Sequence, residues 1–522
     1  MVVPVDGFGR DTRFSRRVGL SFATAAAISC GRQLRDEREL TTLVQSEPSH
    51  LDPRFPTDAL SAYLSRLVYR SLVDVDPHTL AYRNSLAASV RMIDPLNTHV
   101  TIRDDVQFHD GSRLTADDVT ATYRGLMDPQ VGSPVRSITA MILASVRTID
   151  ARTVAFELRE PSGILPLVMA QPIVKATDAQ RREIVAEPGN ERAFVGTGPM
   201  RVASLERNAW RFTRAIARPH SAQSLRFLTV KDANTMALRL LHQRADVAEI
   251  KPELFPLFRD RPGFTFARAR GVACVYLPMR NDHRRLSQLI VRQAIAHAID
   301  REALVRGKFG GLATPATGIL PPWHWAYEGD VQKYAYDPSR ARAMLDQAWP
   351  AGERRRESLI FRCSNQRFTV TTASAITEML RAVGLSVELR PSELSVLLAD
   401  LRAGRFDLSM MQAPDVAEPH ILWTLFATAA QPTPSAPRAG LNRWRFSDAA
   451  LDRAVVAGSR AQERAERAGF YATAQRVLAE RLPVIPLWHP DVIFVGAPRV
   501  QGLVTRGDAR FDPLLDVNLR GL

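Results

Sequence analysis

His109 and Asp110 are adjacent in the sequence and are the first residues whose types could do acid–base chemistry. A histidine beside a carboxylate can move a proton, and two acidic pairs lie close by, at residues 104–105 and 117–118. All of these residues fall at expected turns or at an expected helix start. Turn formation and helix capping explain acidic residues at such positions without catalysis.

No established catalytic motif accompanies them. The chain has no Gly-x-Ser-x-Gly elbow and no His-Glu-x-x-His pair, and Gly307-Lys308 is followed by Phe309, so a phosphate-binding loop is also missing. The eleven histidines are scattered, with no pair at metal-ligand spacing on one helix. The sequence therefore predicts a binding protein without a cofactor or a metal, and not an enzyme.

The overall charge is strongly positive. The 522 residues include 69 Lys and Arg against 55 Asp and Glu, a formal net charge of +14. This charge favours an anionic surface or partner, but the basic residues are spread along the chain without a recognition motif, so we expect no nucleic-acid binding. Cys30, Cys274 and Cys363 are too few and too dispersed for a disulfide scaffold or a zinc site. Cys274 and Cys363 could still pair in an oxidising compartment.

The first 29 residues have the layout of an export signal. Four arginines between residues 10 and 17 precede about a dozen uncharged, mostly apolar or small residues, the length of a signal-peptide core and too short to span a membrane. A short buried helix is the alternative. The sequence Ala-Ile-Ser-Cys at 27–30 resembles a lipobox, which predicts acylation of Cys30 and a periplasmic or lipid-anchored protein. Ser-Arg-Arg at 15–17 resembles a twin-arginine start, so both export routes stay open.

The clearest architectural pattern lies in the second half of the chain. Residues 359–363, 385–389 and 406–411 have the apolar content of strands, and the helices between them are expected to end at Gly384 and Gly404. Strands that alternate with helices in this way form parallel sheets. The sequence therefore predicts an α/β protein.

Three helices have recognisable boundaries. Thr115 and Asp118 predict a helix that begins with a capping box and ends before Pro129. Apolar spacing predicts two long helices, over residues 287–306 and 460–481. These helices would position the segments that carry the more specific motifs.

Residues 108–119 read Phe-His-Asp-Gly-Ser-Arg-Leu-Thr-Ala-Asp-Asp-Val and continue to Asp128-Pro129. This block resembles the signature of extracellular solute-binding protein family 5, the peptide- and nickel-type binding proteins of ATP-binding-cassette (ABC) importers. Five supporting segments occur in the family's order and cover nearly the whole mature chain: residues 67–72, 196–199, 232–235, 291–301 and 336–338.

The resemblance implies the two-lobed clamshell of type II periplasmic binding proteins of the cluster C kind, with an extra domain. Residues 1–29 would be a signal peptide. The first lobe would combine residues 39–72, 190–275 and 489–522. The extra domain would be residues 73–189, inserted in the first lobe, and the second lobe would be residues 276–488.

The resemblance also implies a ligand-binding carboxylate. In the family's peptide binders an aspartate after the last strand of the βαβ run binds the α-ammonium of the ligand, within a pattern Trp-x-x-Asp-Tyr-x-(Asp/Glu)-Pro. Asp415 and the Glu418-Pro419 pair match that pattern, whereas Gln412 and Val416 stand in place of the two aromatics. A carboxylate at the end of a parallel strand projects into the crevice that binds ligands in open α/β sheets.

Six further residues are candidates for the same cleft. They are Asn442, Trp444, Phe446, Arg280, Thr57 and Asp58. The first three lie in a loop with which family members line the cleft, although the two aromatics could equally belong to the core. Arg280 follows the expected lobe crossing and could meet a ligand carboxylate, and the last two residues follow the first strand.

The resemblance implies capture of a solute by closure of the lobes. We expect a monomer that captures di- or oligopeptides and delivers them to a membrane permease with its ATPase subunits. A nickel chelate, haem, glutathione or an oligosaccharide is the alternative ligand. A ligand sensor is a second alternative, but residues 1–38 are too short for the DNA-binding domain that such sensors carry. A peptide hydrolase would need a catalytic constellation that the sequence lacks.

Overall fold

The computed structural model describes residues 36–520, apart from residues 182, 220, 350, 414–415 and 434–439. The predicted signal segment and its Cys30 therefore lie outside the described residues, and so does Asp415. From Glu37 onward the chain forms a unit of its own. Within the described ranges, none of the helices has the length and apolar character that crossing a membrane requires.

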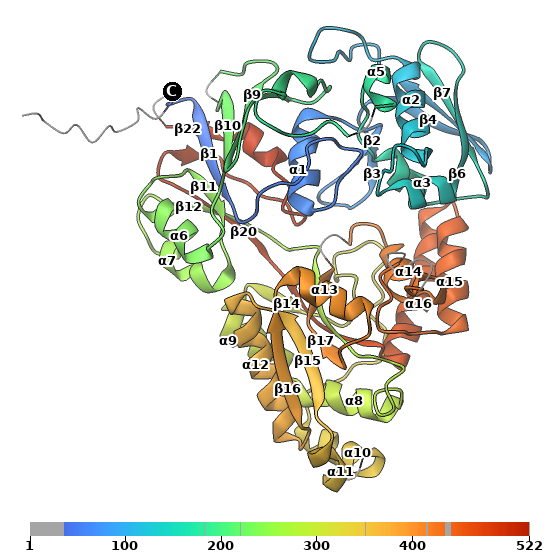
Figure 1. The fold of residues 1–522 in the computed structure, drawn as a ribbon, viewed down its shortest axis with the longest axis vertical. Helices are drawn as coiled ribbons and strands as arrows, with labels where there is room; N and C mark the ends of the chain where they lie inside the picture. Colours follow the sequence, from blue (N-terminus) through green and yellow to red (C-terminus); the bar gives the residue numbers. More distant parts are fainter. Residues whose placement is uncertain are drawn as a thin grey trace, which may run out of the picture. The chain divides into compact units, whose positions relative to one another are not determined.

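A seven-stranded sheet holds the first strand (Figure 1). β1 (Glu39–Val44) is buried along its whole length and runs parallel to both neighbours, β10 and β11. The order of strands is β12-β20-β11-β1-β10-β9-β8. The other members are β8 (Met200–Glu206), β9 (Ala209–Arg214), β10 (Ser224–Thr229), β11 (Val247–Glu249), β12 (Thr265–Ala269) and β20 (Val492–Gly496). Helices α6 (Ala233–Leu241) and α7 (Pro256–Arg259) connect its strands.

Residues 73–189, called the insert below, contain a separate four-stranded antiparallel sheet. Its order is β4-β5-β7-β6, and Val119 and Tyr123 of α2 pack on it within one apolar cluster. The elements from residue 59 to 179 are α1 (Ala59–Val68), β2 (Val73–Val75), β3 (Tyr82–Asn84), β4 (Ala87–Asp94), β5 (Asn97–Ile102), α2 (Ala116–Met127), α3 (Arg136–Ile142), β6 (Leu143–Thr148), β7 (Thr153–Leu158), α4 (Leu165–Met169) and α5 (Ala176–Ala179).

The predicted capping box of α2 is confirmed. The Thr115 hydroxyl accepts a hydrogen bond from the Asp118 N–H, and Oδ2 of Asp118 accepts one from the Thr115 N–H at 2.9 Å. Just before it, His109 Nε2 lies 2.9 Å from the Gly198 carbonyl oxygen, and Oδ2 of Asp110 lies 2.6 Å from the Lys175 ammonium. The signature block thus holds the start of α2 against a neighbouring turn.

Thr115→Ala should lower stability by about 1 kcal/mol, because the first turn of α2 loses the side-chain acceptor for a backbone N–H. The measurement is the shift of the denaturation midpoint in urea. Thr473→Ala is the matched control, since Thr473 is exposed inside a helix where alanine is the better helix former. Equal midpoints for the two variants would contradict the role of the cap.

The predicted parallel sheet is confirmed in residues 359–409. β15 pairs in parallel with β16 and with β17. Its elements are β15 (Leu359–Ser364), α12 (Arg367–Ala382), β16 (Val387–Ser392), α13 (Leu394–Arg402) and β17 (Leu408–Ser409). Gly384 and Gly404 follow the two helices with φ of 90° and 70°, a conformation that glycine adopts without strain.

A second four-stranded sheet, in the order β14-β19-β13-β18, lies beside this run. Its strands are β13 (Cys274–Pro278), β14 (Ala313–Pro315), β18 (Met411–Ala413) and β19 (Val484–Pro490). The helices of this half are α8 (Leu289–Ala298), α9 (Arg301–Phe309), α10 (Pro338–Ala348), α11 (Ala351–Arg356), α14 (Ile421–Phe426), α15 (Ala449–Arg460) and α16 (Arg464–Arg481). A short pair, β21 (Val500–Gln501) and β22 (Asn518–Leu519), lies near the C-terminus.

Two of the predicted helices were wrong in extent. The helix expected over residues 287–306 is divided into α8 and α9, because Ile299 is extended and the Asp300 side chain caps α9, its Oδ1 accepting a hydrogen bond from the Ala303 N–H at 2.8 Å. The helix expected from residue 460 begins at Arg464, after the separate helix α15 has ended. In both cases an apolar pattern continues across a break of the backbone.

The chain passes twice between the seven-stranded sheet and the second four-stranded sheet. One crossing joins β12 to β13, and the other is at Asp491, between β19 and β20. The crossings run side by side, since His489 Nδ1 donates to the Ala273 carbonyl oxygen at 3.0 Å and a Cβ on Gly271 would overlap the Pro490 carbonyl oxygen. They form the hinge between a first lobe, which holds the seven-stranded sheet, and a second lobe between the crossings.

Candidate functional site

The strand that precedes the predicted anchor Asp415 ends at the hinge. β18 pairs antiparallel with β13, and Ala413, the last residue of β18, lies opposite Cys274, the first residue of β13. Because Cys274 comes directly after the first crossing, the carboxyl end of β18 lies at the boundary between the lobes. Asp415 itself falls outside the described residues, so its role stays a prediction.

The chain that follows Asp415 is buried between the two halves of the molecule. Val416 is fully buried, and it shares one apolar cluster with Val75 and Leu80 of the insert and with Tyr276 of β13. Residues from the insert and from the second lobe therefore meet in a common core at this point. Val416, which stands in place of an aromatic residue of the family pattern, is part of that core.

Glu418, the other acidic match, forms a buried ion pair. Its Oε1 lies 2.5 Å from Nη2 of Arg467, and the two side chains are 9% and 6% exposed. Oε1 also accepts a hydrogen bond from the His420 N–H at 3.2 Å, and Arg467 Nε donates to the Gly458 carbonyl oxygen at 3.1 Å. Burial raises the pKa of Glu418, and the Arg467 guanidinium opposes that shift. The pair ties residues 416–420 to α16.

Aromatic rings that the sequence analysis did not single out surround this ion pair. The guanidinium groups of Arg464 and Arg467 lie over the ring of Trp325, 4.8 and 5.4 Å from its centroid. His420 stacks on Trp423 with an angle of 10° between the rings. Trp325 ends the run Pro-Pro-Trp-His-Trp at 321–325, and this density of aromatic residues was the signal that could have pointed to it.

Two buried polar atoms at the hinge have no hydrogen-bond partner in the described part of the chain. They are Nε1 of Trp323 and Nε2 of His489, on rings whose centroids are 5.8 Å apart. The guanidinium of Arg270 lies 5.6 Å from the centroid of the Trp323 ring. Next to them Arg268 Nε donates to Oδ2 of Asp491 at 2.6 Å. The hinge therefore presents a donor and an acceptor that a ligand or a water molecule can satisfy.

Three buried histidines make stability dependent on pH. Burial lowers the pKa of His324, His420 and His489 to about 4, whereas an unfolded histidine titrates near ~6.5. The unfolded state therefore binds more protons in that interval, so stability is complete above pH 6.5 and falls as the pH approaches 4. His420→Gln should flatten this loss of melting temperature between pH 7 and 4.5, whereas a change at the exposed His78 should not. Equal slopes would contradict the assignment.

The three candidates of residues 442–446 lie in the core of the second lobe. Asn442 is fully buried, and its side-chain amide donates to three backbone carbonyl oxygens at 2.8 to 3.1 Å. Trp444 packs edge-to-face on Tyr276, with ring centroids 5.7 Å apart, and Phe446 belongs to the same apolar cluster as Val416. These contacts give the three residues a structural task, and their contact with a ligand stays a prediction.

The other three candidates lie apart from this cluster. Arg280 Nη1 donates to the Gly404 carbonyl oxygen at 2.8 Å, and its Nε lies 3.0 Å from Oδ1 of Asp282. Thr57 is exposed in the first lobe. Asp58 caps α1, where its Oδ1 accepts a hydrogen bond from the Ser61 N–H at 2.8 Å. For Thr57, Asp58 and Arg280, too, a ligand contact stays a prediction.

The two described cysteines do not form a disulfide. Cys274 and Cys363 are both buried and both free. Burial raises the pKa of each thiol, that of Cys363 to about 11, so neither is a ready nucleophile. No group of three His, Cys, Asp or Glu side chains within the described ranges could hold a metal ion.

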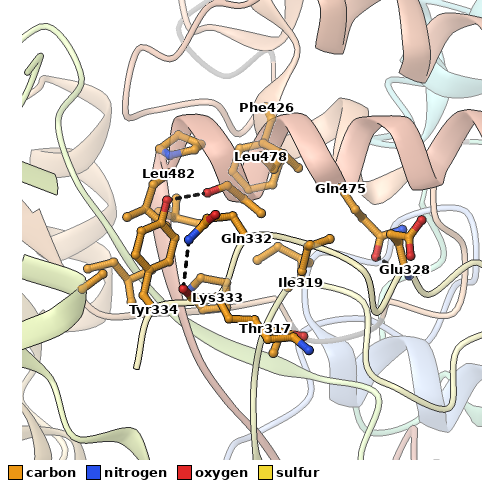
Figure 2. Close-up of a pocket in the computed structure, with 18 of the residues that line it drawn as sticks. Thr317, Ile319, Glu328, Gln332, Lys333, Tyr334, Phe426, Gln475, Leu478 and Leu482 are labelled. Carbon is orange, nitrogen blue, oxygen red and sulfur yellow. Dashed lines mark hydrogen bonds between the residues drawn. The ribbon is translucent and has the colours of Figure 1, made fainter. Parts of the chain in front are cut away.

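A pocket also lies inside the second lobe (Figure 2). It has about 680 Å³ of empty space, which includes space open to solvent, and its walls are largely apolar side chains such as Phe426 and Leu478. Its polar groups are bonded within the lobe, since the Tyr334 hydroxyl donates to the Ala479 carbonyl oxygen at 2.9 Å. Because residues of the second lobe alone line this pocket, it is separate from the boundary at β18.

Residues 81–432 match the family described as bacterial extracellular solute-binding proteins, family 5 middle. The di/tripeptide-binding protein 4 of Pseudomonas aeruginosa (strain UCBPP-PA14) is 28% identical over 523 residues, which cover 93% of this chain and 96% of that protein. The glutathione-binding protein GsiB of Escherichia coli (strain K12) is 25% identical, with coverage of 95% and 96%. The crystal structure of NikZ from Campylobacter jejuni in complex with Ni(L-His) shares the fold, with a TM-score of 0.80, 19% identity and coverage of 92% and 100%.

Proposed function

Because the chain belongs to the bacterial extracellular solute-binding proteins of family 5, we propose that it captures small peptides between its lobes for a membrane permease. Its relatives are solute-binding proteins and not enzymes, so ATP hydrolysis belongs to partner subunits of the importer. Two relatives that bind a di- or tripeptide and glutathione support a ligand with peptide groups and a free ammonium. One chain supplies both lobes, so a monomer is sufficient.

The position of β18 is the observation that carries this proposal. The strand ends opposite Cys274 at the hinge, and Asp415 comes two residues after it in the sequence. The ion pair between Glu418 and Arg467 holds the chain just beyond at the lobe boundary. A carboxylate in this segment would meet the α-ammonium of a peptide in a medium of reduced dielectric, where a charge-assisted hydrogen bond is strong.

Backbone groups of the peptide would find partners at the hinge. The Nδ1–H of His489 donates to a carbonyl oxygen, so its Nε2 is an acceptor, and the indole N–H of Trp323 is a donor. A peptide unit offers one donor and one acceptor in return. Contacts of this kind form with any peptide backbone, which is how a binding protein can accept many side chains.

Location follows from the sequence segment before the described chain. We propose that residues 1–29 direct export and that acylated Cys30 holds the protein at the outer face of a bacterial membrane. Metabolic labelling with a fatty-acid analogue tests this. Label in the wild type and none in Cys30→Ala would support it, and label in neither would contradict it.

Isothermal titration with di- and tripeptides tests the captured ligand. We expect saturable binding of peptides with a free amino terminus and much weaker binding of the same peptides after N-acetylation, because acetylation removes the positive charge. Glutathione, a nickel–histidine complex, haem and an oligosaccharide complete the panel. Strong binding of a ligand without an ammonium group, with no heat from any peptide, would overturn the proposal.

A further inference from the structure

The insert touches the second lobe at a surface far from β18 in the sequence. We call this surface the insert contact, and its residues are Thr79, Glu160 and Gly163 of the insert with Ser459, Arg460 and Arg464 of the second lobe. The Gly163 N–H donates to the Ser459 carbonyl oxygen at 2.8 Å, and Arg464 Nη2 donates to the Thr79 carbonyl oxygen at 2.9 Å. These bonds join parts of the chain that are some 300 residues or more apart.

Gly163 sits so close to the second lobe that only glycine fits. A Cβ at this position would overlap the carbonyl oxygen of Ala461 and would lie 2.9 Å from Cδ of Arg467. The next residues, Ile164 and Leu165, are buried in the core of the insert. The insert and the junction between α15 and α16 therefore meet backbone against backbone, without side chains between them.

Arg467 connects this surface to the candidate ligand site. Its aliphatic stem packs beneath Gly163, while its guanidinium forms the buried ion pair with Glu418. One rigid side chain thus contacts both the insert and the segment that follows Asp415. A displacement of the insert would remove one side of the packing that orients this guanidinium.

The insert moves with the first lobe. His109 bonds the Gly198 carbonyl oxygen at the entry to β8, and Ile184 N–H donates to Oδ2 of Asp52 at 3.0 Å. A rotation about the hinge that separates the lobes must therefore break the insert contact. The described arrangement, with this contact formed, is a closed one.

We propose that the insert contact is a second closing surface of this protein and that Arg467 is a positioning residue that couples it to residues 416–420. This inference rests on the proposed capture of a solute between the lobes. The apparent dissociation constant equals the intrinsic constant divided by the closed fraction, so a change that lowers the closed fraction ~10-fold weakens binding ~10-fold. The ligand itself need not touch the insert contact.

Gly163→Ala tests the proposal, with Gly307→Ala as the matched control. A Cβ on Gly307, in α9, meets no atom within 4 Å, so that variant should behave as the wild type. Small-angle scattering without ligand should show a larger radius of gyration for Gly163→Ala alone. Amide exchange in residues 416–420 should become faster, and affinity for an equimolar mixture of di- and tripeptides should fall about 5-fold or more.

A charge exchange at the same surface guards against a folding defect. Glu160→Arg should open the protein, since it places two guanidinium groups together at Arg460, and the double variant Glu160→Arg with Arg460→Glu should restore the scattering curve and the exchange rates. Restoration supports the proposal, because a damaged fold would not recover when a second residue is changed.

Identical scattering curves and exchange rates for wild type, Gly163→Ala and Glu160→Arg would overturn the inference. If the wild type binds no peptide, the proposed ligand is wrong, yet the curves without ligand still decide whether the insert contact controls closure. If the wild type binds peptides and Gly163→Ala opens the protein with no loss of affinity, the coupling through Arg467 is refuted while the proposed function stands.

Discussion

Arg467→Met is expected to lower the free energy of unfolding by about 3–5 kcal/mol, because it leaves Glu418 buried without its positive partner. Burial already raises the pKa of Glu418, and removal of the guanidinium takes away the group that opposes this shift. The methionine keeps the apolar stem that packs beneath Gly163, so the loss reports mainly the charge. The expected result is a large drop in the denaturation midpoint.

The double variant Glu418→Gln with Arg467→Met should recover most of that loss, since no buried charge remains. Arg476→Met is the matched control from the same helix. Its ion pair with Glu328 is also 2.5 Å long, but its side chain is 49% exposed, so its removal should cost no more than about 1 kcal/mol. Equal midpoints for Arg467→Met and Arg476→Met would contradict the structural role of the buried pair.

Asp415→Asn is expected to weaken the binding of peptides with a free amino terminus by roughly 10- to 150-fold, the equivalent of a charge-assisted hydrogen bond of about 1.5–3 kcal/mol. Asparagine keeps the size and one acceptor oxygen of the side chain and removes its charge. The variant should therefore fold normally and lose the electrostatic part of the interaction with the α-ammonium. Titration calorimetry measures the change.

N-acetylated peptides distinguish loss of the charge pair from general damage to the site. Wild type and Asp415→Asn should bind them equally weakly, because the ligand no longer carries the positive charge. Glu466→Gln serves as the control, since Glu466 is an exposed carboxylate of the same lobe. If Asp415→Asn and Glu466→Gln bind free peptides as tightly as the wild type, another residue anchors the ligand.

Local features of the fold could be predicted because their partners are close in the sequence. The Thr115 hydroxyl and the Asp118 carboxylate are three residues apart, and both groups bond within one helical turn. The parallel run from Leu359 to Ser409 follows from strands and helices of ordinary length with glycines at the helix ends. The break between α8 and α9 was missed, because apolar residues continue on both sides of Asp300 and hide its capping role.

The surroundings of the candidate site could not be predicted in the same way. The sequence marks Glu418 as a possible ligand residue, but its partner Arg467 is 49 residues away on another helix. Asn442 has the amide of a binding residue, and its burial among carbonyl groups is visible only once α14 and the following loop are packed. Which polar side chain faces a ligand and which supports the backbone depends on packing.

The sequence by itself determined the family signature, the capped helix α2, the parallel sheet and the segment in which Asp415 stands, since each depends on residue types at short spacing. Only the tertiary structure decided that β18 ends at the hinge, that Glu418 is paired and that Gly163 meets the second lobe. Those contacts join residues tens to hundreds of positions apart. Such contacts arise when whole elements pack together, and no local pattern of side chains records which surfaces will meet.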